Sequence, residues 1–319
     1  MAGEKLAKRQ VRASPGRASA AEKRRRSPNS GRRATGSGKH RMRVVSSLRE
    51  LRTARAALPG PVGLVPTMGY LHEGHLSLIR RAKSECASVG VSIFVNPTQF
   101  GPGEDLDSYP VDLPRDLAML RRAQVDLVWT PDRESIYPDG YQTWVEVDDL
   151  THHLEGRRRH GHFRGVTTIV TKLFNGFQPD KAYFGQKDAQ QATVIRRMVR
   201  DLDFPLEVVV CPTVREADGL AMSSRNGYLN PEERQVATVL YRALTAASTA
   251  FEAGQREARQ LRRTMRQVLK TERLARPQYV SVADPDTLAE LSGPVERGLL
   301  SMAVFIGKTR LIDNVLVGD

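Results

Sequence analysis

Short apolar runs and longer mixed segments alternate along most of the chain. The apolar runs are typical of strands buried on both faces, and they lie at residues 62–66, 89–95, 127–130, 181–184 and 206–211. The segments between them carry apolar residues at helix spacing, and they predict helices at about 46–57, 76–85, 112–123, 163–175 and 189–201. Because strands and helices alternate, we expect an α/β fold with a parallel sheet covered by helices.

The pattern changes after Pro212. Asn230 and Pro231, followed by two acids, predict a helix start, because they supply a cap, a rigid first turn and negative charge at the positive dipole end. This helix is expected to reach about residue 253 and a second to span about 256–272, with strands following at 279–283, 299–306 and 309–316. We therefore predict a Rossmann-like doubly wound parallel sheet over residues 44–212 and a smaller C-terminal α+β domain over residues 213–319.

The composition fits a globular protein. A chain of 319 residues is long enough for about two domains, and its 40% hydrophobic residues can build a sizeable core. No apolar run approaches the ~20 residues that span a bilayer, so we expect no membrane association. Cys86 and Cys211 show no metal-ligand spacing and are too few for a disulfide framework, which indicates a reducing, cytoplasmic location.

The net charge of +13 is concentrated at the N-terminus. Residues 1–43 hold fourteen Lys or Arg and two acids, or +12, whereas the 35 basic and 34 acidic residues of 44–319 leave +1. This tail is poor in large apolar residues, so we expect it to be disordered. Its run Lys23-Arg24-Arg25-Arg26 favours non-specific contact with nucleic acid or anionic lipid. A neutral extension, or translation that begins at Met42, explains the tail equally well.

The motif His72-Glu73-Gly74-His75 follows the first predicted strand. A loop of small residues lets a ligand approach the backbone, and the start of the next helix offers free N–H groups to a phosphate. Two imidazoles three residues apart near a helix start can face the same side. The tetrapeptide alone also occurs by chance, as ordinary surface or core histidines.

Two other segments supply groups that phosphates need. Gly185-Gln186-Lys187-Asp188 places a lysine at the end of a strand, and Met222-Ser223-Ser224-Arg225 joins hydroxyls to a cation. Backbone donors, hydroxyls and fixed positive charge together suit a triphosphate. Each segment alone is an ordinary loop, but their combination resembles the signatures of class I aminoacyl-tRNA synthetases and related nucleotidyltransferases.

Within this HxGH nucleotidyltransferase superfamily, the chain resembles the pantothenate synthetase (pantoate–β-alanine ligase) family from about residue 44 to residue 317. The resemblance rests on spaced blocks in the family's order, at residues 66–69, 71–78, 91–101, 161–166, 185–188 with 190–191, and 214–216 with 222–226. The basic tail lies outside it.

The resemblance implies an ATP-dependent condensation of (R)-pantoate with β-alanine. ATP and pantoate would first form pantoyl adenylate and pyrophosphate, and β-alanine would then displace AMP to give pantothenate. Adenylation is needed because a carboxylate oxygen is a poor leaving group, so the enzyme supplies positioning and charge stabilisation. The resemblance also implies a homodimer, and Mg²⁺ held by ATP phosphates and water rather than by a metal cage.

Roles for single residues follow from the same resemblance. His75 is the implied catalytic residue, as a proton donor, while Gln99 would bind pantoate and border the β-alanine site, and Gln191 would be the second pantoate amide. The C-terminal domain would act as a lid on the triphosphate. The implied ATP-binding residues are Met68, Gly69, Tyr70, Leu71, His72, Glu73, Gly74, His75, Gly185, Gln186, Lys187, Asp188, Val214, Met222, Ser223, Ser224 and Arg225.

Four positions depart from the family's usual residues without removing an implied role. Tyr70 replaces an alanine in the ATP loop, where it either faces solvent or crowds the nucleotide. His160 replaces a proline and loosens the backbone there. Gln186 replaces a frequent glutamate and Ala189 a frequent aromatic residue.

Other polar clusters have plainer explanations. His152, His153, His160 and His162, with Glu155 nearby, match no zinc spacing, so we favour no resident metal. The neighbours Asp148 and Asp149 are expected to be solvated in an extended segment. Two alternative functions stay open: another HxGH adenylyltransferase, acting for example on NMN or phosphopantetheine, and nucleic-acid binding by the basic tail.

Overall fold

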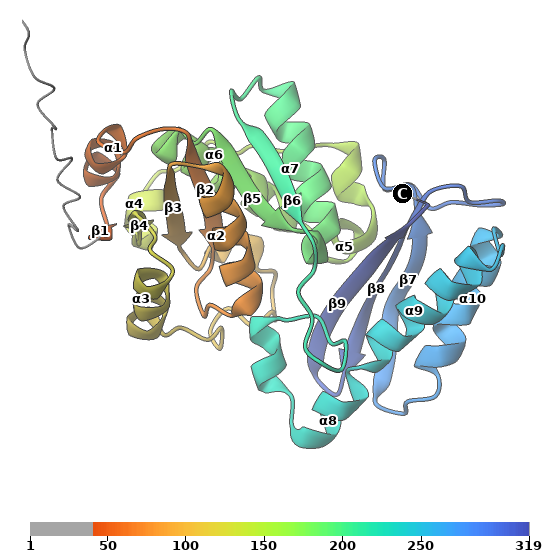
Figure 1. The fold of residues 1–319 in the computed structure, drawn as a ribbon. Helices are drawn as coiled ribbons and strands as arrows, with labels where there is room; N and C mark the ends of the chain where they lie inside the picture. Colours follow the sequence, from red (N-terminus) through yellow and green to blue (C-terminus); the bar gives the residue numbers. More distant parts are fainter. Residues whose placement is uncertain (1–40, 319) are drawn as a thin grey trace, which may run out of the picture. The chain divides into compact units, whose positions relative to one another are not determined.

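Six parallel strands form the larger of two sheets in the computed structural model, which describes residues 41–318 (Figure 1). Their order is β1-β4-β3-β2-β5-β6, and all of their pairings are parallel. The strands are β1 (Arg43–Val45), β2 (Val62–Thr67), β3 (Ser88–Ile93), β4 (Leu127–Trp129), β5 (Lys181–Gly185) and β6 (Glu207–Cys211). The predicted α/β fold is confirmed. The tail was predicted to be disordered over residues 1–43, which is wrong at its end, because Arg43 pairs with β4 as part of β1; residues 1–40 lie outside the described residues.

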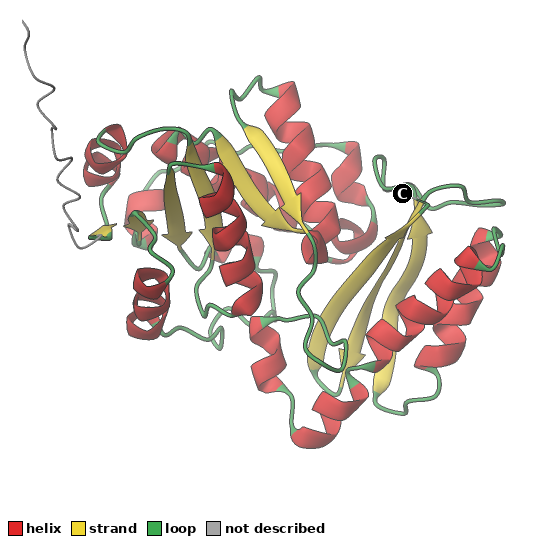
Figure 2. Ribbon diagram, in the orientation of Figure 1, coloured by secondary structure: helices red, strands yellow, loops and turns green. Residues whose placement is uncertain are grey.

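Helices cover both faces of this sheet (Figure 2). The strands carry apolar side chains toward both, since Leu64 of β2 faces one core and the next residue, Val65, faces the other. The fold is therefore doubly wound, as predicted. One face is covered by α1 (Leu48–Ala56), α6 (His162–Phe177) and α7 (Ala189–Asp201), and the other by α2 (Glu73–Glu85) and α3 (Leu113–Arg122).

The strand order reverses between β2 and β5. Strand β2 pairs with β3 on one side and with β5 on the other, so the chain leaves β2 and β5 toward opposite halves of the sheet. Such a switch point opens a crevice at the carboxyl ends of the strands, where α/β proteins bind ligands. The two loops that leave β2 and β5 carry His72 and Lys187.

A second, antiparallel sheet follows, in the order β7-β8-β9. Its strands are β7 (Ala275–Ala283), β8 (Gly298–Ile306) and β9 (Thr309–Val317), and its covering helices are α9 (Val239–Glu252) and α10 (Ala258–Leu269). Leu240, Leu261 and Met302 belong to the core between these helices and the sheet. Leu299 and Leu316 instead pack into the core of the parallel sheet, so the second sheet contacts both parts of the fold.

Several elements differ from the predictions, and three of the differences have a local cause. Strand β1 was not predicted, because three residues beside the tail give no pattern until they pair with β4. Helix α2 begins at Glu73 rather than near residue 76, since His72 caps it. The predicted helix from residue 230 to 253 is two helices, α8 (Pro231–Val236) and α9, which are separated at residues 237–238 without a Gly or Pro to mark the break.

Candidate active site

A cavity of about 240 Å³ lies at the carboxyl ends of β2 and β5. It adjoins a larger cavity of about 530 Å³, with which it shares Arg159, Lys187, Asp188, Ser223 and Arg225. The loops that leave β2 and β5 therefore border one cavity. The predicted site residues that line the smaller cavity are Met68, His72, Gly74, His75, Gln99, Gly185, Lys187, Asp188, Gln191, Val214, Met222, Ser223, Ser224 and Arg225.

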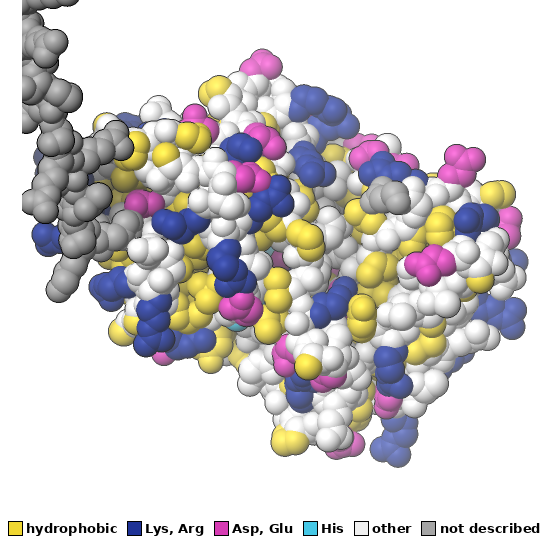
Figure 3. Space-filling model, viewed as in Figure 1, with side chains coloured by type: hydrophobic (Ala, Val, Ile, Leu, Met, Phe, Trp, Pro, Cys, Tyr) yellow, Lys and Arg dark blue, Asp and Glu magenta, His cyan; other side chains and the backbone are white. Residues whose placement is uncertain are grey.

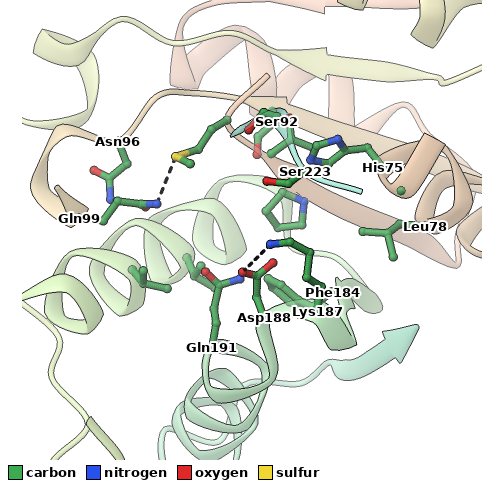
Figure 4. Close-up of a pocket in the computed structure, with 18 of the residues that line it drawn as sticks. His75, Leu78, Ser92, Asn96, Gln99, Phe184, Lys187, Asp188, Gln191 and Ser223 are labelled. Carbon is green, nitrogen blue, oxygen red and sulfur yellow. Dashed lines mark hydrogen bonds and ion pairs between the residues drawn. The ribbon is translucent and has the colours of Figure 1, made fainter. Parts of the chain in front are cut away.

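The two imidazoles of the HxGH motif lie side by side, with ring centroids 4.1 Å apart. His72 Nδ1 accepts the Gly74 N–H at 3.1 Å, and His75 Nδ1 accepts the His72 N–H at 3.3 Å. Because Nδ1 accepts in both rings, Nε2 carries the proton in each. Both rings line the cavity, and Figure 4 shows His75 at the opposite end of it from Gln99.

Gly74 makes this arrangement possible. A Cβ at Gly74 would lie 2.8 Å from Cε1 and 2.9 Å from Nδ1 of His72. Any side chain would therefore displace the first imidazole from its capping position. The glycine of the motif thus lets His72 fold back over the helix start while His75 lies one turn into α2.

Burial makes both histidines poor bases. Desolvation, with the nearby Lys187 ammonium adding to it, lowers the pKa of His72 to about 4. Desolvation, with the His72 ring and the Lys187 ammonium adding to it, lowers the pKa of His75 to about 3. At neutral pH both imidazoles are therefore uncharged N–H donors, which can stabilise developing negative charge without first losing a proton.

Lys187 enters the cavity from the turn that follows β5. Its Nζ lies 3.5 Å from Asp188 Oδ1, as Figure 4 shows. Asn314 of β9 holds the backbone of this turn, because its Nδ2 donates to the carbonyls of Gln186 at 3.0 Å and Lys187 at 2.9 Å. The backbone of Lys187 is therefore fixed, and its side chain lines the cavity, where its ammonium group could pair with a phosphate.

The segment from Met222 to Arg225 lies against the start of α2. The Met222 Cβ is 3.9 Å from the point that a Gly74 Cβ would occupy. Arg225 forms a bidentate ion pair with Asp105, at 2.9 Å from Nε and 2.8 Å from Nη2. The segment therefore lines the same cavity as the HxGH motif, although about 150 residues separate them along the chain.

Two amides complete the cavity wall. Gln99 Nε2 donates to the Met68 sulfur at 3.1 Å, and its Oε1 accepts from Asn96 at 3.0 Å. A thioether is a weak acceptor, so a carboxylate or hydroxyl would readily replace it. The Gln191 side chain hydrogen-bonds to no other residue within 41–318, and Figure 4 shows it reaching the cavity from α7 beside Asp188.

The turn that carries Gln99 is fixed by a buried asparagine. Asn96 Nδ2 donates to the Gly165 carbonyl at 3.1 Å, and its Oδ1 accepts the Tyr137 hydroxyl at 2.9 Å. Helix α6 touches this turn directly, because a Cβ at Gly165 would lie 2.4 Å from the Thr98 carbonyl oxygen. This close approach fixes Gln99 relative to the sheet.

His162 supports the same turn from α6. Its Nδ1 lies 2.7 Å from the Gln99 carbonyl, and its Nε2 lies 3.0 Å from Arg159 Nη1. A guanidinium can only donate, so Nδ1 carries the proton and donates to Gln99. Burial, and then the charge of Arg159, lower the pKa of His162 to about 4. Arg159 is itself paired with Glu104, at 2.6 Å.

These supporting roles were not predicted. Asn96 and His162 fall inside sequence blocks of the resemblance, but their function depends on partners that only the fold brings close. Asp116 in α3 had no sequence signal. It is buried, and it accepts the N–H groups of Tyr70 at 2.7 Å and Leu71 at 2.8 Å, so it holds the loop that precedes the HxGH motif.

Five predicted ATP-binding residues do not line the cavity: Gly69, Tyr70, Leu71, Glu73 and Gln186. Tyr70 has a φ of 50°, and the Arg115 guanidinium carbon lies 5.1 Å from its ring centroid. Its ring therefore does not crowd the cavity. Glu73 pairs with Arg80, and the Gln186 side chain donates to Asn314 at 3.1 Å. Any contact of these residues with ATP remains a prediction.

The histidines near residue 155 do not form a metal site. Within residues 41–318, no group of three or more His, Cys, Asp or Glu side chains could hold a metal ion. His152 and His153 instead lie 3.8 Å from Asp148 and Asp149, which are exposed as predicted but belong to a 3-10 turn rather than an extended segment. Of the other departures, His160 is exposed and Ala189 is buried in the core.

The surface of the described residues has no dominant charge. On the face shown in Figure 3, Lys and Arg side chains are interspersed with Asp and Glu. Both cysteines are free thiols. None of the helices within residues 41–318 is long and apolar enough to cross a bilayer.

Comparison with known proteins agrees with this geometry. Residues 40–316 match the sequence profile of the Pantoate-beta-alanine ligase family. The chain is 62% identical over 276 residues to the pantothenate synthetase of Roseiflexus sp. (strain RS-1), covering 86% of this chain and 99% of the relative.

Solved structures agree as well. Pantothenate synthetase from Thermus thermophilus superposes with a TM-score of 0.82 at 51% identity, covering 86% of this chain and 99% of that one. The pantoate-beta-alanine ligase from Francisella tularensis, solved as a complex with "Beta-gamma ATP" and beta-alanine, gives a TM-score of 0.73 at 35% identity, covering 86% and 98%. The chain therefore belongs to the pantoate–beta-alanine ligase family.

Proposed function

We propose that this protein condenses (R)-pantoate with β-alanine at the expense of ATP, and releases pantothenate, AMP and pyrophosphate. One observation carries the proposal. The HxGH imidazoles, Lys187, the Met222–Arg225 segment and the amides of Gln99 and Gln191 line a single cavity at the switch point of the sheet. Family membership and the ligands of the Francisella tularensis relative support the same reaction.

The reaction proceeds by replacing a poor leaving group with a good one. A pantoate carboxylate oxygen attacks the α-phosphorus of ATP, and pyrophosphate leaves. The amine of β-alanine then attacks the acyl carbon, and AMP leaves with the former pantoate oxygen. Because neither step needs a protein nucleophile, positioning and charge stabilisation account for catalysis.

The imidazoles and Lys187 stabilise the first step. His72 and His75 are neutral N–H donors in the buried cavity, so they would donate from Nε2 to phosphate oxygens as charge develops. The Lys187 ammonium would exchange Asp188 for the departing pyrophosphate. In this assignment His75 is the catalytic residue, acting as a hydrogen-bond donor, and the hydroxyls of Ser223 and Ser224 hold the triphosphate.

Pantoate fits the other end of the cavity. Its carboxylate and hydroxyl groups need donors, which the amides of Gln99 and Gln191 supply. Its dimethyl carbon needs an apolar surface, and buried side chains of α6 line the cavity there, among them Val166, Ile169 and Val170. Gln99 also borders the space for β-alanine in this assignment.

Mg²⁺ would enter with ATP. Asp188 is the one carboxylate among the described residues that line the cavity, which fits an ion held by phosphate oxygens and water rather than by a protein cage. Such an ion would neutralise phosphate charge. Titration calorimetry with Mg²⁺ alone should show no site of micromolar affinity, whereas tight binding of Mg²⁺ without ATP would contradict this assignment.

Product analysis tests the function. Pyrophosphate release should require pantoate, and AMP should form in equal amount to pantothenate when β-alanine is present. An adenylyltransferase of the same superfamily would instead release pyrophosphate with NMN or phosphopantetheine and without pantoate. That result would reject the proposal.

Three wider assignments belong to the same proposal. The protein would act as a cytoplasmic homodimer, residues 44–212 would bind ATP and pantoate, and residues 213–319 would close over the triphosphate. Light scattering after gel filtration measures the oligomeric state. Deleting residues 1–41 should leave pantothenate synthesis undiminished, because the body carries the site; a large loss would support a role for the basic tail.

A further inference from the structure

Two adjacent polar residues of β9 are buried, and they lie far along the chain from the sequence motifs that line the cavity. Asp313 is 2% exposed and Asn314 is 5% exposed. Consecutive side chains of a strand project to opposite faces, so these two can reach two different segments. Asp313 contacts the segment that follows β6 and Asn314 contacts the turn that follows β5, and both segments line the cavity.

Asn314 holds the turn that presents Lys187. Its amide nitrogen donates to both the Gln186 and the Lys187 carbonyl oxygens, at 3.0 and 2.9 Å, while its Oδ1 accepts from Gln186 Nε2 at 3.1 Å. All three hydrogen bonds of the amide therefore go to one turn, two to its backbone and one to the Gln186 side chain.

Asp313 holds the other segment through Arg215. Both oxygens of its carboxylate accept from the guanidinium, at 2.6 Å from Nη1 and 3.0 Å from Nη2. Arg215 Nη1 also donates to the Gly219 carbonyl at 3.1 Å, and the Met222 N–H donates to the Val214 carbonyl at 3.0 Å. The ion pair thus fixes a hairpin whose two arms carry Val214 and Met222 into the cavity.

We infer that Asp313 and Asn314 are positioning residues for ATP, which tie the Lys187 turn and the Val214–Met222 hairpin to one strand of the second sheet. This inference rests on the proposed function, because it uses the role assigned there to Lys187, and on the family resemblance, which implies that Val214 binds ATP. Neither residue lines the 240 Å³ cavity, and Asp313 lines the adjoining cavity of about 530 Å³. Each acts through the backbone or side chain that it holds.

The two residues should affect different steps. Lys187 pairs with the part of ATP that leaves as pyrophosphate, so loosening its turn should weaken ATP binding and slow adenylation alone. The hairpin holds Val214, which by the family resemblance would meet the adenine, and this part of ATP stays bound until AMP leaves. Loosening the hairpin should therefore slow both adenylation and the attack of β-alanine.

Isosteric variants separate these effects. Asn314→Asp replaces the donating amide nitrogen with a carboxylate oxygen that faces two carbonyl oxygens. Asn314→Ala removes the donor without adding charge, and it serves if the first variant does not fold. Asp313→Asn keeps the shape but weakens the bond to Arg215. Ser301→Ala is the matched control, because Ser301 lies opposite Asn314 on β8, and its buried hydroxyl has no partner among the described residues.

Four measurements decide the inference: thermal unfolding, ATP affinity by calorimetry with Mg²⁺ present, pantoate-dependent pyrophosphate release, and pantothenate formation from enzyme loaded with synthetic pantoyl adenylate. Asn314→Asp should weaken ATP binding at least about tenfold, which corresponds to about 1.4 kcal/mol, and should slow pyrophosphate release. Its reaction of the loaded adenylate with β-alanine should stay within about twofold of wild type. Asp313→Asn should slow both steps, and Ser301→Ala neither.

Two results would overturn the inference. One is a folded Asn314 variant that binds ATP as tightly as the wild type. The other is an equal slowing of both half-reactions by Asn314→Asp, which would indicate a merely structural role. Failure of the wild type to release pyrophosphate with pantoate would reject the proposed function instead, while the comparison of ATP affinities would still decide this inference.

Discussion

His75 is half-buried and places an N–H group on the cavity wall, and this combination makes it the most informative single residue. His75→Ala should lower pantoate-dependent pyrophosphate release about 10²- to 10³-fold, the effect of removing one preorganised donor from a developing oxyanion. Ser77→Ala, on the same helix but outside the cavity, is the control. Unchanged turnover in folded His75→Ala would remove His75 from the mechanism.

The lowered pKa values of three histidines predict how the free energy of unfolding depends on pH. His72, His75 and His162 have pKa values of about 4, 3 and 4, below the ordinary value near 6.5. Protons therefore bind the unfolded chain preferentially below pH 6.5, and the stability contributed by these groups is lost as the pH falls toward their folded pKa values.

Chemical denaturation at pH 7, 6 and 5 measures this effect. The free energy of unfolding should fall over that range in the wild type, and should fall less in His75→Ala. Parallel pH profiles for the two proteins would show that His75 titrates normally.

At the residue scale, the sequence identified several residues that the fold brings to one cavity, although their roles stay predictions. His72, Lys187 and Gln191 belong to recognisable sequence blocks, and all of them line the cavity. Asp116 and Asn314 could not be found in this way. Asp116 accepts from, and Asn314 donates to, backbone groups of a segment distant in the sequence. Because only the folded structure brings these groups together, no local sequence pattern predicts the contacts.

At the scale of elements, α3 stabilises the loop between β2 and α2. Asp116→Asn replaces one of two acceptor oxygens with a donor that faces a backbone N–H. It should lower stability by about 1–3 kcal/mol and raise the KM for ATP. Asp112→Asn is the control, because Asp112 caps the same helix through the Arg115 N–H and asparagine is an equally good cap.

Kinetic and unfolding measurements on both variants test this account. An Asp116→Asn protein as stable as Asp112→Asn, with an unchanged KM for ATP, would contradict it.

Elements with strong periodicity were predicted within a few residues, among them α7 and β3. The failures have local causes. The start of α2 was placed too late, because a histidine is an uncommon cap and only the fold shows His72 accepting the Gly74 N–H. The break between α8 and α9 lacks Gly and Pro, so it is decided by tertiary packing, with Ala237 fully buried.

At the scale of the whole molecule, a buried ion pair connects a strand of the second sheet to a helix beside the first sheet. Arg310 of β9 binds Glu155 of α5 (Leu154–Arg158) through two hydrogen bonds, at 2.7 and 2.8 Å, and Tyr279 donates to the same carboxylate at 2.9 Å. Removing Arg310 would leave Glu155 buried without its main partner.

Arg310→Met should therefore cost about 3–5 kcal/mol of unfolding free energy, and the double variant Glu155→Gln/Arg310→Met should recover part of it. Arg200→Ala, which breaks the exposed pair with Asp201, should cost less than about 1 kcal/mol. Equal costs for Arg310→Met and Arg200→Ala, measured by denaturant titration, would refute the assigned importance of the buried pair.

The central claim is that the cavity activates a carboxylate by joining it to AMP, and an isotope measurement tests it most directly. (R)-Pantoate labelled with ¹⁸O in both carboxylate oxygens is converted with ATP and β-alanine, and the products are examined by mass spectrometry. Adenylation predicts one ¹⁸O in each AMP and one in the amide carbonyl of pantothenate. Unlabelled AMP, or ¹⁸O in pyrophosphate or phosphate, would contradict the account.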